Sequence, residues 1–244
     1  MITKSTVFIL GAGASFPYKY PLGEQLVREI NEGLLKGNDL FLSCLALEFS
    51  KREIEEFNNA LRFSGDSSID AFLERNEEYL ELGKVAIALS LFRRESTNEL
   101  FSVGDNKWYG DLVKELKSPL KIDFKNNVSF LTFNYDRSFD QYLFESIKNS
   151  YGISSKECKS LIEDIPIIHL HGQVGKLAWQ GKGEKGRLYD KNFSALSLIN
   201  DHSAPINKYS SYDRDNAVQY IRHEISGQIK IIHENELDSD SAFK

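Results

Sequence analysis

The sequence predicts an α/β protein in which a Rossmann-like parallel sheet is flanked by helices and carries a helical subdomain. Short runs rich in β-branched and aromatic residues occur at residues 6–10, 127–133 and 165–170, and each is followed by glycine or polar side chains. Between the first two runs, residues 39–116 have helical periodicity and no convincing strand. We therefore expect a single domain over residues 1–244 with a helical insertion at 39–116.

The first strand and the turn after it form the clearest local pattern. Residues 6–10 (TVFIL) are apolar and β-branched, which is typical of a buried strand in a parallel sheet. Residues 11–15 (GAGAS) then predict a turn of small residues. Beyond Pro21, leucine and isoleucine recur at helical spacing, so we expect a helix over residues 21–35 with the proline in its first turn.

The insertion is expected to consist of several helices. Apolar residues recur at helical spacing through residues 54–92. Ser68 can cap a helix that begins near Ile69, because its side-chain oxygen can accept a hydrogen bond from a free backbone amide. A further helix over residues 108–116 is expected to pack on the core and to end before Pro119.

The second half of the chain returns to alternating strands and helices. Residues 127–133 (NVSFLTF) predict a strand that leads into Asn134, and the apolar stripe through residues 139–147 predicts the helix that follows. Residues 165–170 (IPIIHL) predict a third strand, with Pro166 at its start, where a missing amide donor is tolerated.

The C-terminal region gives weaker signals. Glycines punctuate residues 172–186, which predicts a loop-rich segment. Residues 228–233 (QIKIIH) predict a possible fourth strand. The tail over residues 234–244 is polar, so we expect it to be flexible.

Composition and charge indicate a soluble globular protein. The chain is 41% hydrophobic and 27% charged, and its net charge is -6 with a pI near 5.5. This balance gives no general attraction to nucleic acids or to anionic membranes. No apolar run approaches the length of a membrane span and no leader peptide is recognisable, so we expect a cytoplasmic protein.

The two cysteines indicate neither a disulfide framework nor a zinc site. Cys44 and Cys158 are far apart in the sequence, and no CxxC pair occurs. We expect both to be buried thiols in a reducing compartment.

The GAGAS turn has the composition of a nucleotide-binding turn. Gly11 and Gly13 remove side chains where the backbone must approach a pyrophosphate, and the amides at the start of the next helix supply donors. Ser15 adds a hydroxyl group. A tight turn selected only for packing remains an alternative. A nicotinamide oxidoreductase is disfavoured, because the acidic ribose-binding residue expected about 20 residues further on would fall in a helical region.

Two polar residues follow the second predicted strand at alternate positions. Asn134 and Asp136 can therefore project to the same side of the strand's carboxyl end. An asparagine side chain both donates and accepts hydrogen bonds, which suits it to orient a water molecule or a ribose hydroxyl. Capping of the following helix by these residues is the structural alternative.

Two histidines occur at the end of the third predicted strand. His169 and His171 should point to opposite faces if the strand continues, so only one of them is expected to face a ligand. His171 is our candidate, because it precedes Gly172 at the strand exit and an imidazole can transfer protons near neutral pH. Metal binding by the pair is disfavoured, because alternation separates the two rings.

Four motifs in this order resemble the sirtuin-like NAD-hydrolase domain family of prokaryotic anti-phage defence systems. They lie at residues 11–15 (GAGAS), 68–73 (SIDAFL), 132–136 (TFNYD) and 170–172 (LHG), and the resemblance covers residues 5–233. It implies that NAD is bound as the substrate and that Asn134 and His171 are the catalytic pair. The residues implied to bind NAD are Gly11, Ala12, Gly13, Ala14, Ser15, Thr132, Asp136 and Gly172, and no metal is implied.

The chain departs from true sirtuins in two respects. It lacks their four-cysteine zinc module, and the helical segment at residues 39–116 stands in its place. We therefore expect NAD hydrolysis rather than lysine deacylation. The further apolar strand with a glycine turn that is usual near the adenosine is also missing, so either the adenosine site is incomplete or a partner chain or a second protomer completes it.

The resemblance implies an NAD+ glycohydrolase that releases nicotinamide and ADP-ribose through an oxocarbenium-like ribose. Asn134 would position the attacking water, His171 would accept a proton, and Asp136 would orient the nicotinamide amide. Such an enzyme would act as a toxic effector of abortive infection, gated by homo-oligomer assembly or by a sensor subunit. A catalytically silent subunit that binds NAD or ADP-ribose remains an alternative, as does, less favourably, an NAD-dependent deacylase.

Overall fold

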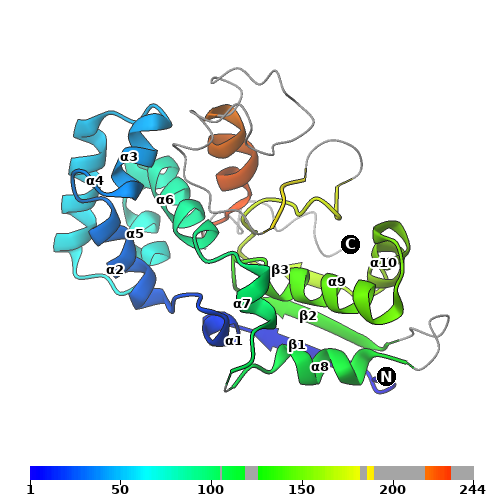
Figure 1. The fold of residues 1–244 in the computed structure, drawn as a ribbon. Helices are drawn as coiled ribbons and strands as arrows, with labels where there is room; N and C mark the ends of the chain where they lie inside the picture. Colours follow the sequence, from blue (N-terminus) through cyan, green and yellow to red (C-terminus); the bar gives the residue numbers. More distant parts are fainter. Residues whose placement is uncertain (105, 119–125, 182–185, 190–217, 232–244) are drawn as a thin grey trace, which may run out of the picture. The chain divides into compact units, whose positions relative to one another are not determined.

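The computed structural model describes residues 1–104, 106–118, 126–181, 186–189 and 218–231, and the chain folds as two compact units (Figure 1). We call them the sheet unit and the helical unit, and describe each by itself. The sheet unit comprises Met1–Tyr20, Glu95–Gly172 and Lys176–Asp190, and the helical unit comprises Pro21–Arg94, Gln173–Gly175 and Lys191–Lys244.

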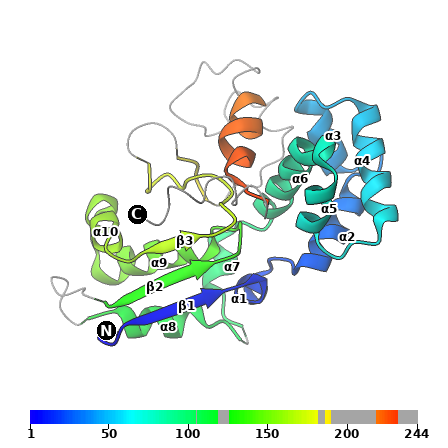
Figure 2. The same ribbon diagram turned by 180° about the vertical axis from the view of Figure 1, so that it is seen from behind.

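The sheet unit is built on three parallel strands, which confirms the predicted α/β class with a parallel sheet. The strands are β1 (Thr6–Leu10), β2 (Val128–Thr132) and β3 (Ile167–His169), and their order is β1-β2-β3. Figure 2 shows the three lying side by side. Leu10 pairs with Thr132, and Thr132 pairs with His169, so the strands end at the same level.

Helices flank this sheet. They are α1 (Ala12–Ser15), the 3-10 turn η1 (Phe16–Tyr18), α7 (Thr97–Phe101), α8 (Tyr109–Leu116), α9 (Ser138–Tyr151) and α10 (Ser155–Ile162). One face of β2 is buried against α9, where the rings of Phe130 and Phe139 lie 4.6 Å apart. On the opposite face, Val7, Ile9 and Ile168 remain exposed.

The helical unit is organised around α6 (Leu80–Phe92), in which every residue from Leu82 to Phe92 is buried. A Cβ atom on Gly83 would lie 2.4 Å from the end of the Leu73 side chain, so any larger residue there would displace Leu73 where α5 packs on α6. The other elements are α2 (Gly23–Gly33), α3 (Asp39–Ala46), α4 (Lys51–Ser64), α5 (Ile69–Arg75), η2 (Glu77–Tyr79), the π-helical turn η4 (Tyr220–Ile225) and η5 (Ser226–Gln228).

The predicted helix start at Ser68 is confirmed, because the Ser68 hydroxyl accepts a hydrogen bond from the Ala71 amide at 3.4 Å. The described residues of the segment 39–116 form helices and loops with no strand, as predicted. Helices α3 to α6 belong to the helical unit and α7 and α8 to the sheet unit. The assignment of 39–116 as one insertion stays a prediction.

Three boundaries differ from the expectation. The helix predicted over residues 21–35 spans Gly23–Gly33, because the chain first makes α1 and η1 directly after β1. The third strand is shorter than residues 165–170, since the chain turns at Leu170. The predicted strand at 228–233 is wrong for its described residues 228–231, where Gln228 ends η5; the tail 234–244 lies outside the described residues.

Both cysteines are buried and unpaired, as expected. Burial raises the pKa of Cys44 to about 12 and that of Cys158 to about 11. In the described part of the chain, no helix is long and apolar enough to cross a membrane.

Candidate active site

The predicted site residues gather where the three parallel strands end. Gly11 follows β1, Asn134 lies two residues beyond β2, and His171 lies two residues beyond β3. Because the strands are parallel and in register, these positions share one edge of the sheet. Ligands of open parallel sheets bind at this edge.

Asn134 joins the first two strand ends. Its side-chain Nδ2 donates to the carbonyl oxygen of Gly11 at 3.0 Å and to the Ser15 hydroxyl at 3.3 Å. The backbone amide of Asn134 donates to Thr132 Oγ1 at 3.0 Å. Both amide hydrogens therefore have acceptors within the protein. The side-chain Oδ1 has no partner among the described residues and stays free to accept.

The glycine turn is exposed and has open space around it. Gly11 has an extended backbone with φ -110° and ψ -176°, and neither Gly11 nor Gly13 has a positive φ. A Cβ atom built on either glycine would meet no atom within 4 Å. Neither backbone conformation nor packing therefore requires glycine here. The alternative in which these glycines serve only packing is not supported by this geometry.

The turn contributes backbone donors rather than a long helix dipole. Helix α1 has only four residues, so it has little macrodipole, whereas a longer helix was expected to follow the strand. Its first amides have no acceptor within the helix. Trp108 holds the turn in place, because its indole N–H donates to the Ala14 carbonyl at 2.9 Å.

His171 lies beside the residues that flank Asn134. Its ring centroid is 5.5 Å from that of Phe133 and 6.4 Å from that of Tyr135. The chain leaves the strand conformation after His169, and Gly172 adopts a positive φ of 72°. The His171 Nδ1 atom is buried and has no hydrogen-bond partner in the described part of the chain. A buried nitrogen without a partner is costly, so it is a plausible contact for a ligand or a water molecule.

His169 contacts the backbone of Asn134, and this contact had no signal in the sequence. Its Nδ1 lies 3.0 Å from the backbone oxygen of Asn134, and because a carbonyl can only accept, Nδ1 carries the proton. Its Nε2 lies 3.2 Å from both Asp140 Oδ2 and Arg137 Nη1. The imidazole thereby fixes the backbone of the candidate catalytic asparagine.

Arg137 and Asp140 hold His169 in place. The Arg137 side chain is fully buried, and its Nη2 donates to Asp140 Oδ1 at 2.9 Å and to Gln180 Oε1 at 2.5 Å. The Arg137 guanidinium and His169 hold the pKa of the Asp140 carboxyl below its usual range, although burial acts in the opposite direction. The signal in the sequence was the spacing of Arg137 and Asp140, which places Arg137 at the N-cap of α9 and Asp140 in its first turn.

Asp136 lies just before the N-cap of α9 and binds its first residue, which is close to the structural alternative that the sequence left open. Its Oδ1 accepts hydrogen bonds from the Ser138 amide at 3.0 Å and from the Ser138 hydroxyl. Burial raises the pKa of the Asp136 carboxyl, and hydrogen bonds from Ser138 and Ser15 oppose that shift. A role for Asp136 in orienting nicotinamide stays a prediction.

A second buried ion pair belongs to the sheet unit. Arg187 Nη2 donates to Glu95 Oε1 at 2.5 Å, and both side chains are at most 5% exposed. Burial raises the pKa of Glu95, although Arg187 acts to lower it. In the same unit, the hydroxyl groups of Tyr20 and Tyr189 lie 2.7 Å apart. Neither pair had a recognisable signal in the sequence.

No known protein family, curated protein or solved structure matches this chain. In the described ranges, no three His, Cys, Asp or Glu side chains gather as a metal site. The assignment of the site therefore depends on its own geometry. That geometry brings Gly11, Ser15, Asn134 and His171 to one edge of the sheet, supported by a buried layer of Asp136, Arg137, Asp140 and His169.

Proposed function

We propose that this protein is an NAD+ glycohydrolase of the sirtuin-like type, which cleaves NAD+ to nicotinamide and ADP-ribose. One observation carries the proposal. The exposed turn at Gly11 and Gly13 does not need glycine for its conformation or packing. It lies at the same sheet edge as the Asn134 side-chain oxygen and the buried His171 Nδ1, and neither atom has a partner among the described residues. A nucleotide fits this combination, because it requires close backbone approach at the pyrophosphate and polar groups at the ribose.

The residues would divide the chemistry as follows. The turn at Gly11 and Gly13 would receive the pyrophosphate against backbone amides. The Asn134 Oδ1 would accept a hydrogen bond from the attacking water and so orient it toward the C1′ carbon. The C1′–N bond breaks with its electron pair leaving on nicotinamide, water adds to C1′, and His171 would accept the proton.

His169 would act as a positioning residue rather than a catalytic one. It donates to the Asn134 carbonyl at 3.0 Å, so it restrains the backbone from which the catalytic amide projects. Its own partners, Arg137 and Asp140, are at most 2% exposed, so solvent does not compete for these hydrogen bonds.

A silent subunit that binds NAD or ADP-ribose is the second candidate. It is favoured by the two internal hydrogen bonds of Asn134 Nδ2 and by the Ser138 hydrogen bonds that engage Asp136, because these leave fewer groups free for chemistry. Lysine deacylation is less favoured, because the chain contains only two cysteines and so lacks the four-cysteine zinc module of sirtuins.

The biological role that we propose is that of a cytoplasmic effector in an anti-phage abortive-infection system. An enzyme that depletes NAD+ would harm its own cell if it were always active. We therefore propose control by homo-oligomer assembly or by a sensor subunit. Nicotinamide release per chain should then rise with protein concentration or on addition of that subunit.

The test measures NAD+ binding by calorimetry and nicotinamide release by chromatography. The parent chain is compared with Asn134→Ala and His171→Ala, and with two matched controls, Asn149→Ala on the exposed side of α9 and His223→Ala in the helical unit. The proposal predicts release that is lost in the first two variants and kept in the controls. Binding without release at every protein concentration tested would favour the silent subunit, and release only with an acylated peptide would favour the deacylase. Absence of NAD+ binding would overturn all three.

A further inference from the structure

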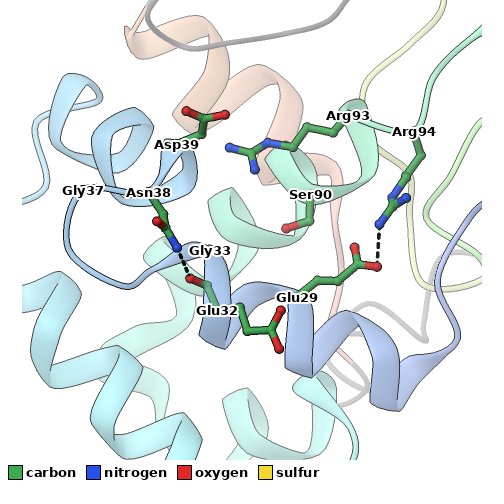
Figure 3. A pocket seen from close by; sticks show the side chains of 9 residues that line it. All are labelled: Glu29, Glu32, Gly33, Gly37, Asn38, Asp39, Ser90, Arg93 and Arg94. Atoms are coloured by element: carbon green, nitrogen blue, oxygen red, sulfur yellow. Dashed lines mark hydrogen bonds and ion pairs between the residues drawn. The ribbon is translucent and has the colours of Figure 1, made fainter.

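The helical unit contains a polar pocket that the proposed function does not use. Its volume is about 570 Å³, which lies within the range of small-molecule sites. It lies between the second half of α2, the start of α3 and the end of α6 (Figure 3). The lining residues are Glu29, Glu32, Gly33, Gly37, Asn38, Asp39, Ser90, Arg93 and Arg94.

Opposite charges line this pocket, and only some of them are paired with one another. Glu29 is paired with Arg94, with Nη2 2.5 Å from Oε1. Arg93 and Asp39 extend toward one another in Figure 3, yet within the described residues no ion pair joins Arg93 to Asp39 or to Glu32. Three carboxylates and two guanidinium groups line the pocket, which leaves one negative charge in excess.

Ser90 supplies an independent sign of a ligand. The residue is only 5% exposed and lines the pocket, and its hydroxyl has no hydrogen-bond partner in the described part of the chain. A serine inside a helix can bond to the carbonyl four residues earlier, and Ser90 does not. The Asn38 side chain does not cap α3, although Asn38 is the N-cap residue. It donates instead to the Glu32 carbonyl at 2.7 Å. Polar groups at this pocket therefore have hydrogen-bonding capacity that the described residues do not use.

The lining excludes several ligand classes. None of the nine residues is aromatic or aliphatic, so the pocket offers no aromatic ring for a nucleobase and no apolar wall for a lipid. The excess of carboxylates would repel a simple anion, and the Arg93 guanidinium would repel a simple polyamine.

We propose that this pocket binds a small zwitterion with an additional cationic group, as in a basic α-amino acid. The ligand carboxylate would pair with Arg93 and accept from Ser90, whereas the two amino groups would pair with Asp39 and Glu32. The net charge of +1 on such a ligand matches the single excess negative charge of the lining. All nine lining residues belong to the helical unit, and none belongs to the proposed NAD site.

The test titrates the full chain with three matched probes by calorimetry. They are L-lysine, cadaverine, which is lysine without its carboxylate, and L-norleucine, which lacks the ε-amino group. The proposal predicts that lysine binds with a Kd in the millimolar range or tighter and that each of the other probes binds about tenfold more weakly. Equal binding of lysine and cadaverine, or no saturable binding of lysine, would overturn it.

Two variants assign the contacts. Arg93→Gln should weaken lysine binding about tenfold and should not weaken cadaverine binding, because it removes a like charge from the pocket. Asp39→Asn should weaken both. The control is Arg28→Gln, because Arg28 lies on the same helical unit, makes only an exposed pair with Glu24 and does not line the pocket. Circular dichroism would verify folding, since all three substitutions are at exposed positions. A loss of lysine binding in the Arg28 variant as large as in the Arg93 variant would contradict the assignment.

Discussion

Gly13→Ala should increase stability and decrease NAD+ affinity at the same time. Gly13 lies in α1, does not have a positive φ, and a Cβ atom there would meet no atom within 4 Å. The alanine therefore adds no clash and removes conformational freedom from the unfolded chain. Such substitutions stabilise by about 0.4–1 kcal/mol. For a chain of this size, that corresponds to a rise in Tm of about 1–4 °C.

The same methyl group would occupy the space in which the pyrophosphate is proposed to lie. The backbone amide of residue 13 is retained, so the variant tests the space and not the donor. We expect NAD+ affinity to fall at least about tenfold, which is about 1.4 kcal/mol. Thermal unfolding and calorimetric titration with NAD+ measure the two effects separately.

Gly227→Ala is the matched control for Gly13→Ala. Gly227 also has open space around it, and it belongs to η5 of the helical unit. This variant should leave NAD+ affinity unchanged. Unchanged affinity in Gly13→Ala would refute the role of the turn, and a lower Tm in that variant would refute the inference that the space is open.

Three further substitutions test the supporting structure. His169→Ala removes the donor to the Asn134 carbonyl, so we expect kcat to fall about tenfold with little change in KM. We also expect the free energy of unfolding in urea to fall by about 1–3 kcal/mol, because buried groups lose their partner. An unchanged kcat would exclude the positioning role. Burial raises the pKa of Asp136 in the folded state, so its contribution to stability is fully present below the unfolded pKa and is lost as pH rises through the folded pKa. The parent should therefore gain stability relative to Asp136→Asn as the pH falls from 7 to about 4. The measurement is urea unfolding of both proteins at several pH values, and a difference in unfolding free energy that does not change with pH would contradict this prediction. Gly83→Ala places a Cβ 2.4 Å from Leu73 and should cost about 1–3 kcal/mol of unfolding free energy, whereas a neutral effect would show that α5 and α6 can separate freely.

The sheet could be predicted from the sequence because its strands carry strong local signals. The runs that became β1, β2 and β3 are dense in β-branched and aromatic residues, and each ends at a glycine or a polar residue. The end of β3 was placed too late because Leu170 continues the apolar pattern, whereas the chain turns toward Gly172, which has a positive φ. Local composition does not encode such a turn uniquely.

The residues of the candidate site could be named from the sequence, but the contacts among them could not. The positions of Asn134 and His171 follow from parallel strands that end together. The network of Arg137, Asp140 and His169 depends on contacts between distant parts of the sequence, since Arg137 and His169 are 32 positions apart. Sequence patterns report spacing along one element, and they do not show which buried charges meet across two.

A double-mutant cycle of Asn134→Ala and His171→Ala tests most directly whether the two side chains act on the same step. The measured quantity is the rate of nicotinamide release by the two single variants and by the double variant. If both groups serve the same attack on C1′, the double variant should be about as slow as the slower single variant. Losses that multiply fully would contradict a shared site, as would a single variant that retains the parental rate.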